Sequence, residues 1–477
     1  MSLDLSLEGL QRASERAAQL FTAIYGQLEE RPVDPRVTRQ QMCALFEGSI
    51  SDEGVGLDRV LEEFEEKVLP NSMGTPHPLY FGLVNSSPLP AGPLADLLLS
   101  SLNNNGGAFH QSPAMSAAEA EVICQFGRLC GLGDDASGMI LPGGTYANLQ
   151  GLLLARHAHF PQWQNEGPVS LTGRPLIYQS DVTHFCNDRA ALVMGIGQRG
   201  MVRIPSQGRG TINLEMLEGQ ILRDRESGNV PFAVVANGGT TGTGAIDNID
   251  GLADICQRHK LWLHVDACYG GGALLLEPGL PEFEGLSRAD SIAIDPHKWF
   301  FVPMTAGILL TPHRQLEQDT FDVAASYIPG DGVLDPFRRG IPTSRRSTGL
   351  TVWMILRAHG WNVIRQSVER NVALTRMLED QLRETGFRVL ADGQLSVACA
   401  RWEPAGYDQR GLDELQMRIA ESVVATGRAW FSTVKHEGEI WLRMNLVNIH
   451  TREHHIETLA ELIKHAAHQS ASSAAES

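Results

Sequence analysis

Four segments of the chain place residues with useful chemistry directly after short apolar runs. In the first, residues 141–148 (LPGGTYAN), the pair Gly143 and Gly144 precedes an expected helix with Thr145 as its N-terminal cap. The free N–H groups of a first helical turn bind anions, and glycines let an anion approach the backbone closely. The segment therefore predicts a phosphate site, although such a glycine pair also fits a simple tight turn.

The second and third segments each carry one charged residue. Asp266 follows the apolar residues 263–265, where a buried carboxylate needs a cation or a metal ion, or else caps a helix. Lys298 follows residues 291–294 and has His297 and two aromatic residues beside it. Such surroundings would lower the pKa of the amine and let it attack a carbonyl carbon, whereas a solvated lysine would only carry charge.

The fourth segment, residues 179–185 (QSDVTHF), carries His184, which taken alone also fits an ordinary core histidine. Together the segments supply an anion cradle, a carboxylate, an amine and an imidazole. Pyridoxal 5'-phosphate (PLP) uses all four, for its phosphate, its ring nitrogen, its aldehyde and its ring face. We therefore predict a PLP site in which Lys298 forms a Schiff base and Asp266 keeps the ring nitrogen protonated.

The elements that must position these residues alternate between short apolar runs and helical patterns. Such alternation predicts an α/β fold with a mostly parallel sheet covered on both faces, which binds ligands at the carboxyl ends of its strands. The expected strands are 139–141, 175–178, 232–236, 261–265 and 291–294, and two expected helices are 148–157 and 249–259.

The domain boundaries follow from changes in sequence texture. We predict an N-terminal helical dimerisation segment (1–76), a large PLP-binding α/β domain (77–357), a small C-terminal α+β domain (358–467) and a disordered tail (468–477). The helical patterns in 4–30 and 57–68 leave an apolar stripe that must pack on the main body or on a second subunit.

Composition excludes several classes of protein. The 477 residues include 56 acidic and 39 basic side chains, a formal net charge of −17, so we expect no nucleic acid as partner. Seven cysteines without a C-x-x-C pair predict no disulfide framework and no metal site. The N-terminus lacks a signal-peptide pattern and no window is apolar enough to span a membrane, so we expect a cytoplasmic protein. The common phosphate-loop, serine-hydrolase, zinc-protease and dinucleotide motifs are also missing.

The sequence resembles the group II PLP-dependent amino-acid decarboxylases of fold type I, which include the aromatic-amino-acid, glutamate and diaminobutyrate decarboxylases. The resemblance covers nearly the whole chain, and its most specific motifs are HVDA at 264–267 and PHKW at 296–299. It implies an obligate homodimer with the active site at the subunit interface. It also implies these cofactor-binding residues: Gly143, Gly144, Thr145, His184, Thr241, Asp266, Cys268, Asp295, His297 and Lys298.

The roles implied by the resemblance are specific. Lys298 would hold the cofactor, Asp266 would pair with its ring nitrogen, His184 would stack on the ring, and Thr241 would lie near the ring hydroxyl. The substrate, an L-amino acid, would lose CO2 and leave as the corresponding amine. Asp295 stands where many members carry asparagine. The negative charge of this aspartate is unfavourable beside a phosphate dianion unless its carboxylate points away.

One departure from the family bears on the product. In the family a loop tyrosine commonly protonates the carbanion, but here the nearest position is Phe337 or Pro336, and Tyr327 is the only tyrosine in that region. In similar aldehyde synthases a phenylalanine there accompanies oxidative deamination. We favour the amine as product because His184, Tyr327 or water can deliver the proton.

The sequence leaves both the cofactor and the substrate side chain open. A protein that binds a different phosphorylated metabolite without PLP would use the same anion cradle, with Lys298 as a mere charge. Leu83 and Val84 replace residues that are aromatic in the aromatic-amino-acid decarboxylases, and this favours an aliphatic or small polar substrate side chain.

Overall fold

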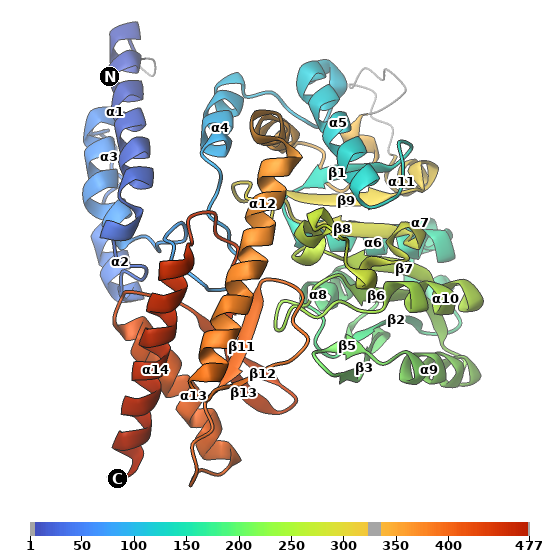
Figure 1. The fold of residues 1–477 in the computed structure, drawn as a ribbon. Coiled ribbons are helices and arrows are strands. Elements are labelled where there is room, and N and C mark those ends of the chain that lie inside the picture. Colours follow the sequence, from blue (N-terminus) through green and yellow to red (C-terminus); the bar gives the residue numbers. More distant parts are fainter. Residues whose placement is uncertain (1–4, 323–334, 476–477) are drawn as a thin grey trace.

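The computed structural model describes residues 5–322 and 335–475, built around one large and one small β-sheet (Figure 1). In the seven-stranded sheet, four neighbouring pairs are parallel, and β9 runs antiparallel to both of its neighbours. The strand order is β1 (Ser137–Leu141), β9 (Gly307–Thr311), β8 (Ser291–Ile294), β7 (Trp262–Asp266), β6 (Val230–Asn237), β2 (Pro175–Ser180) and β3 (Met201–Ile204). The predicted α/β class with a mostly parallel sheet is confirmed.

Alternation along the strands divides the core between the two faces of this sheet. On β1, Met139 and Leu141 join one buried cluster with Leu152 of α6 (Gly144–His159), while Ile140 joins another with Ile123 of α5 (Pro113–Leu129). Both faces are apolar because helices cover both, as a doubly covered sheet requires. The helices α9 (Leu214–Glu226) and α10 (Ile249–His259) also contribute to the second cluster.

The remaining helices of this part of the chain are short. They are α4 (Ala91–Leu102), α7 (Trp163–Glu166), α8 (Cys186–Val193) and α11 (Arg314–Phe321). A two-residue hairpin, β4 (Ser206–Gln207) with β5 (Thr211–Ile212), lies outside the main sheet. The five strands expected from the sequence are present, but β3 and β9 were not predicted.

The C-terminal part forms a four-stranded antiparallel sheet with helices packed against it (Figure 1). The strand order is β10 (Arg388–Val389), β11 (Val397–Arg401), β13 (Glu439–Asn445) and β12 (Ser432–His436). The helices are α12 (Thr348–Glu384), α13 (Gln409–Ala425) and α14 (Glu453–Ala475). Within α12, Gly360 has φ +70° and interrupts the helix.

The two ends of the described chain are helical. Helix α14 continues to Ala475, into residues expected to be disordered, because this stretch is rich in alanine and lacks glycine and proline. At the other end, α1 (Leu7–Gly26), α2 (Arg39–Phe46) and α3 (Leu57–Glu63) form a separate helical group (Figure 1). No helix among the described residues combines the length and apolar character that a bilayer crossing requires.

Candidate active site

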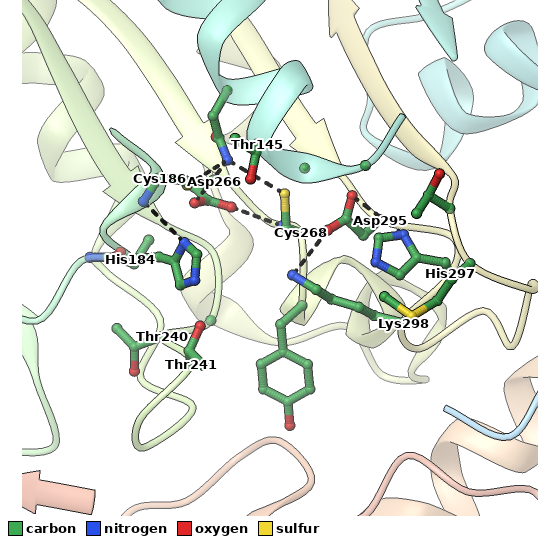
Figure 2. Close-up of a pocket in the computed structure, with 18 of the residues that line it drawn as sticks. Thr145, His184, Cys186, Thr240, Thr241, Asp266, Cys268, Asp295, His297 and Lys298 are labelled. Carbon is green, nitrogen blue, oxygen red and sulfur yellow. Dashed lines mark hydrogen bonds and ion pairs between the residues drawn. The ribbon is translucent and has the colours of Figure 1, made fainter. Parts of the chain in front are cut away.

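A cavity of about 290 Å³ opens at the carboxyl ends of the central strands, and ten predicted site residues line it (Figure 2). Asp266 is the last residue of β7, Lys298 follows β8, and the glycine pair connects β1 to α6. The structure therefore brings together these residues, which lie far apart in the sequence: Gly143, Gly144, Thr145, His184, Thr241, Asp266, Cys268, Asp295, His297 and Lys298.

The anion cradle differs from the expectation in one detail. Gly143, with φ +91°, is the N-terminal cap of α6, and Thr145 is the second residue inside the helix rather than the cap. The glycine takes this position because few other residues adopt such a φ. A Cβ atom on Gly144 would lie 2.5 Å from Cys268 Sγ and 2.6 Å from Asp295 Oδ2, so the cradle requires glycine. The N–H groups of Tyr146 and Ala147 donate to the Gly143 carbonyl at 3.0 and 3.3 Å, so the N–H groups that face an anion at this helix start are those of Gly144 and Thr145.

Asp295 lies at this cradle and pairs with the lysine. Its Oδ2 is 2.9 Å from Lys298 Nζ, while its Oδ1 receives no hydrogen bond from residues 5–322 or 335–475. The carboxylate therefore does not point out of the cavity. Its charge is balanced by the lysine, so it does not face a phosphate as a bare negative charge.

The pKa of Lys298 moves in the direction opposite to the sequence expectation. Burial lowers this pKa, but the negative charges of Asp295 and Asp266 outweigh burial and raise it above its ordinary value. The expectation of a lowered pKa was wrong because it considered only the apolar neighbours in sequence and not the carboxylate three residues earlier.

Asp266 is buried without an ion pair among the described residues. Its Oδ1 accepts a hydrogen bond from the Cys268 backbone N–H at 3.2 Å, and its Oδ2 accepts one from Asn148 Nδ2 at 3.2 Å. These two donors fix the orientation of the carboxylate, which lines the cavity.

The two predicted histidines also face the cavity (Figure 2). Burial lowers the pKa of His184, and the backbone N–H of Cys186 donates to its Nδ1 at 3.3 Å. A neutral ring with an occupied Nδ1 carries its proton on Nε2. His297 Nδ1 lies 2.7 Å from the carbonyl oxygen of Ala306, which anchors this ring at the cavity wall.

Some residues named from the sequence are not part of the cavity. Phe337 lies outside its lining, and its N–H donates to the carbonyl of Gly107 at 3.0 Å. Tyr327 falls outside the described residues. Leu83 is half exposed and Val84 is packed in the core, so neither lines the cavity of this chain.

Sequence reasoning missed several lining residues. They are Pro142, Asn148, Cys186, Asn237, Gly239, Thr240, Tyr269, Met304 and Thr305. Asn148 had a signal in the sequence, because it lies four residues after Gly144 and so on the same face of the helix. The loop that carries Thr241 is also held from the small sheet, since Arg443 Nε donates to its carbonyl at 2.9 Å.

Comparison with known proteins identifies the family. The profile described as "Pyridoxal-dependent decarboxylase conserved domain" matches residues 39–402, which is most of the chain. The chain belongs to the pyridoxal-dependent decarboxylase family. It is a PLP-dependent amino-acid decarboxylase, a lyase of amino-acid metabolism, and the hypothesis of a PLP-free binding protein is dropped.

Individual relatives agree with this family. The aromatic-L-amino-acid decarboxylase of Bacillus atrophaeus is 29% identical, with 94% of each chain covered. The human acidic amino acid decarboxylase GADL1 is 30% identical over 76% of this chain and 71% of the relative. Among solved structures, Oryza sativa TDC with PLP and tryptamine has a TM-score of 0.92 at 24% identity, covering 98% of this chain and 99% of that one. The predicted fold type is confirmed.

The residues of this decarboxylase fit PLP. One cavity is lined by glycines at the start of α6, which leave room for a phosphate, by the Lys298 amine, and by Asp266. The Asp266 carboxylate accepts two hydrogen bonds from the protein. Each matches one functional group of the cofactor.

Proposed function

We propose that this decarboxylase converts an L-amino acid to the corresponding amine and CO2, with Lys298, Asp266 and His184 acting on the cofactor and substrate. The observation that carries the proposal is that Lys298, Asp266 and the N-terminus of α6 line one cavity. Bound PLP supplies a protonated ring that takes up the electron pair left when CO2 departs.

The residues of the chain then have distinct tasks. The N–H groups at the start of α6, with Thr145, would bind the phosphate. Asp266 would hold a proton at the ring nitrogen, and Lys298 would supply the amine that holds the cofactor covalently. His184 would cover the ring face and Thr241 would serve the ring hydroxyl, while Asp295, His297 and Cys268 would complete the wall beside the phosphate and the lysine.

His184 favours the amine over the aldehyde. After CO2 leaves, the substrate carbon needs a proton, and His184 Nε2–H is a donor that lines the cavity. Tyr327 and water are further donors compatible with the sequence. The decarboxylase therefore does not depend on a tyrosine at position 337.

Oxidative deamination is the second candidate function. The sequence position of Phe337, near that of the family's loop tyrosine, supports it and makes Phe337 the catalytic candidate for that reaction, although Phe337 does not line the cavity of this chain. That reaction consumes O2 and water and releases an aldehyde, ammonia, hydrogen peroxide and CO2. Decarboxylation alone releases only amine and CO2.

One experiment separates these functions. The purified holoenzyme is incubated with a panel of L-amino acids, and CO2, amine, aldehyde and peroxide are quantified for each. We expect amine and CO2 in a 1:1 ratio, with aliphatic or small polar side chains preferred, and no activity in Lys298→Ala. Aldehyde and peroxide in proportion to CO2 would overturn the amine assignment.

We also propose a homodimer with residues 1–76 as its dimerisation segment, located in the cytoplasm. Large apolar side chains of the N-terminal helices and α4 are exposed, namely Leu7, Leu10, Leu57, Val60, Leu94, Leu97, Leu98 and Leu102. Exposed apolar area of this kind marks an interaction surface. Analytical ultracentrifugation should give twice the chain mass, and a monomer at micromolar concentration would refute the dimer.

The domain boundaries remain a proposal of the same kind. The large sheet supports a PLP-binding domain at 77–357, and the small sheet supports a domain at 358–467. The break at Gly360 inside α12, three residues after the proposed boundary, is consistent with this division.

A further inference from the structure

A chain of buried hydrogen bonds leads from the protein interior to Asp266. Trp262 Nε1 donates to Ser291 Oγ at 2.8 Å, and Ser291 Oγ lies 2.7 Å from His264 Nδ1. His264 Nε2 lies 2.6 Å from Asn148 Oδ1, and Asn148 Nδ2 donates to Asp266 Oδ2 at 3.2 Å. All five residues are at most 8% exposed, so water does not compete for these bonds.

The donors and acceptors along this chain can be arranged in only one direction. An ionised Asp266 only accepts, so Asn148 presents its amide N–H to it and its oxygen to His264. The ring of His264 must then donate from Nε2 and accept at Nδ1. Ser291 consequently donates its hydroxyl proton to His264, and its oxygen accepts from Trp262, whose indole can only donate.

Two further observations fix this direction. The second N–H of Asn148 faces sulfur atoms, Cys186 Sγ at 3.4 Å and Cys268 Sγ at 3.6 Å, so the amide is fully satisfied in one orientation. Burial lowers the pKa of His264 to about 4, which keeps its ring neutral at neutral pH. A doubly protonated ring would instead present an N–H to Ser291 and reverse that bond.

The helix face beside these residues is shaped to admit them. A Cβ atom on Gly151, three residues after Asn148, would lie 2.7 Å from both His264 Nδ1 and His264 Cε1. The imidazole can therefore reach Asn148 only because position 151 carries no side chain. The packing of α6 on the sheet is thus built around the contact between His264 and Asn148.

We propose that Trp262, Ser291, His264 and Asn148 form a positioning relay that holds the Asp266 carboxylate aimed at the ring nitrogen of PLP. The inference rests on the proposed role of Asp266 and extends it to Asn148, which lines the cavity, and to Trp262, Ser291 and His264, which do not. Asp266 forms no ion pair in the described parts of the chain, and its two oxygens accept from Asn148 and from the Cys268 backbone, so hydrogen-bond donors hold its orientation. Each bond in the relay polarises the next and strengthens the final donor.

The test compares two ligands that differ only at the ring nitrogen. Apoenzyme is titrated with PLP and with 1-deaza-PLP, in which a C–H replaces that nitrogen, and the ratio of the two dissociation constants is measured. In the wild type this ratio favours PLP, because only PLP gives Asp266 a proton-bearing partner. Loss of a donor to a charged acceptor should reduce the ratio roughly 10- to 100-fold in Asn148→Leu.

The effect should decline with distance from Asp266. His264→Leu should reduce the ratio severalfold, while His264→Gln, which keeps a donor at the place of Nε2, should restore most of it. Trp262→Phe, at the far end, should change it by about twofold or less. A purely structural role would weaken both ligands equally and leave the ratio unchanged in all variants, which would overturn the relay.

Asp266→Asn separates failure of the relay from failure of the proposed function. If Asp266→Asn lowers the ratio and Asn148→Leu does not, the relay is wrong but the role of Asp266 stands. If Asp266→Asn leaves the ratio unchanged, Asp266 does not face the ring nitrogen and both proposals fall. Thermal unfolding of each apoenzyme identifies any variant that does not fold, and His264→Gln then provides the comparison that a collapsed His264→Leu cannot.

Discussion

Replacing Asp295 with asparagine should lower the pKa of Lys298 and make its amine more reactive. The pair has a Nζ–Oδ2 distance of 2.9 Å, and Asp295 is 2% exposed. Coulomb's law with an effective dielectric constant of about 20 gives an attraction of about 6 kcal/mol at this distance. That is the largest single opposition to the effect of burial, which acts to lower this pKa.

The expected shift is smaller than this attraction alone implies. Lys298 is 22% exposed, so solvent screens part of the attraction, and the asparagine keeps a hydrogen bond to the amine. We therefore expect the pKa to fall by about two units, which corresponds to about a hundredfold more neutral amine near pH 7.5.

The assay measures the lysine directly in the apoenzyme. Apoenzyme is mixed with pyridoxal, which lacks a phosphate, and the Schiff base at Lys298 is trapped with borohydride and quantified by mass spectrometry over a range of pH. The ratio of variant to wild-type rates cancels the titration of the aldehyde itself. Asp295→Glu, which keeps the charge, is the matched control, and an apparent pKa that moves by less than half a unit in Asp295→Asn would refute the reasoning.

Three further predictions concern the cradle, the core and acid stability. Gly144→Ala should weaken PLP binding at least tenfold in a spectrophotometric titration because its Cβ would collide with a cysteine sulfur, while Gly219→Ala on α9, where only an arginine side-chain nitrogen lies close (3.3 Å), should not. Arg345→Met should lower the free energy of unfolding by about 3–5 kcal/mol in a denaturant titration, because it leaves Glu119, now 2.9 Å from the guanidinium, buried and unpaired. Adding Glu119→Gln should recover part of that loss. Burial lowers the pKa of His77 to about 4, so the unfolded chain binds its proton first and the free energy of unfolding should fall as pH drops from 6.5 to 4, with a shallower slope in His77→Asn.

Most of the large domain could be predicted because its strands are apolar on both faces and end at residues of obvious chemistry. Asp266 directly follows the expected strand 261–265, and three residues lie between the expected strand 291–294 and Lys298. Predicting the strands therefore also located the site. Strand β9 was missed because its antiparallel direction follows no strand–helix alternation. The direction of the Lys298 pKa shift was missed because the sequence shows which residues are neighbours but not which oxygen faces which nitrogen.

Asn148, which sequence reasoning missed, shares one face of α6 with two glycines. Gly144, Asn148 and Gly151 are spaced by four and three residues, so they line one face of the helix that packs on the sheet. The two glycines leave room for Asp295 and His264, and the asparagine between them bonds to Asp266. Each helix position is therefore matched to one polar residue on β7 or directly after β8. In this arrangement an amide side chain stands between two glycines on a helix face, and the facing strands end in acidic residues. Such an amide is better explained as a support for the site than as a residue that only packs the helix on the sheet.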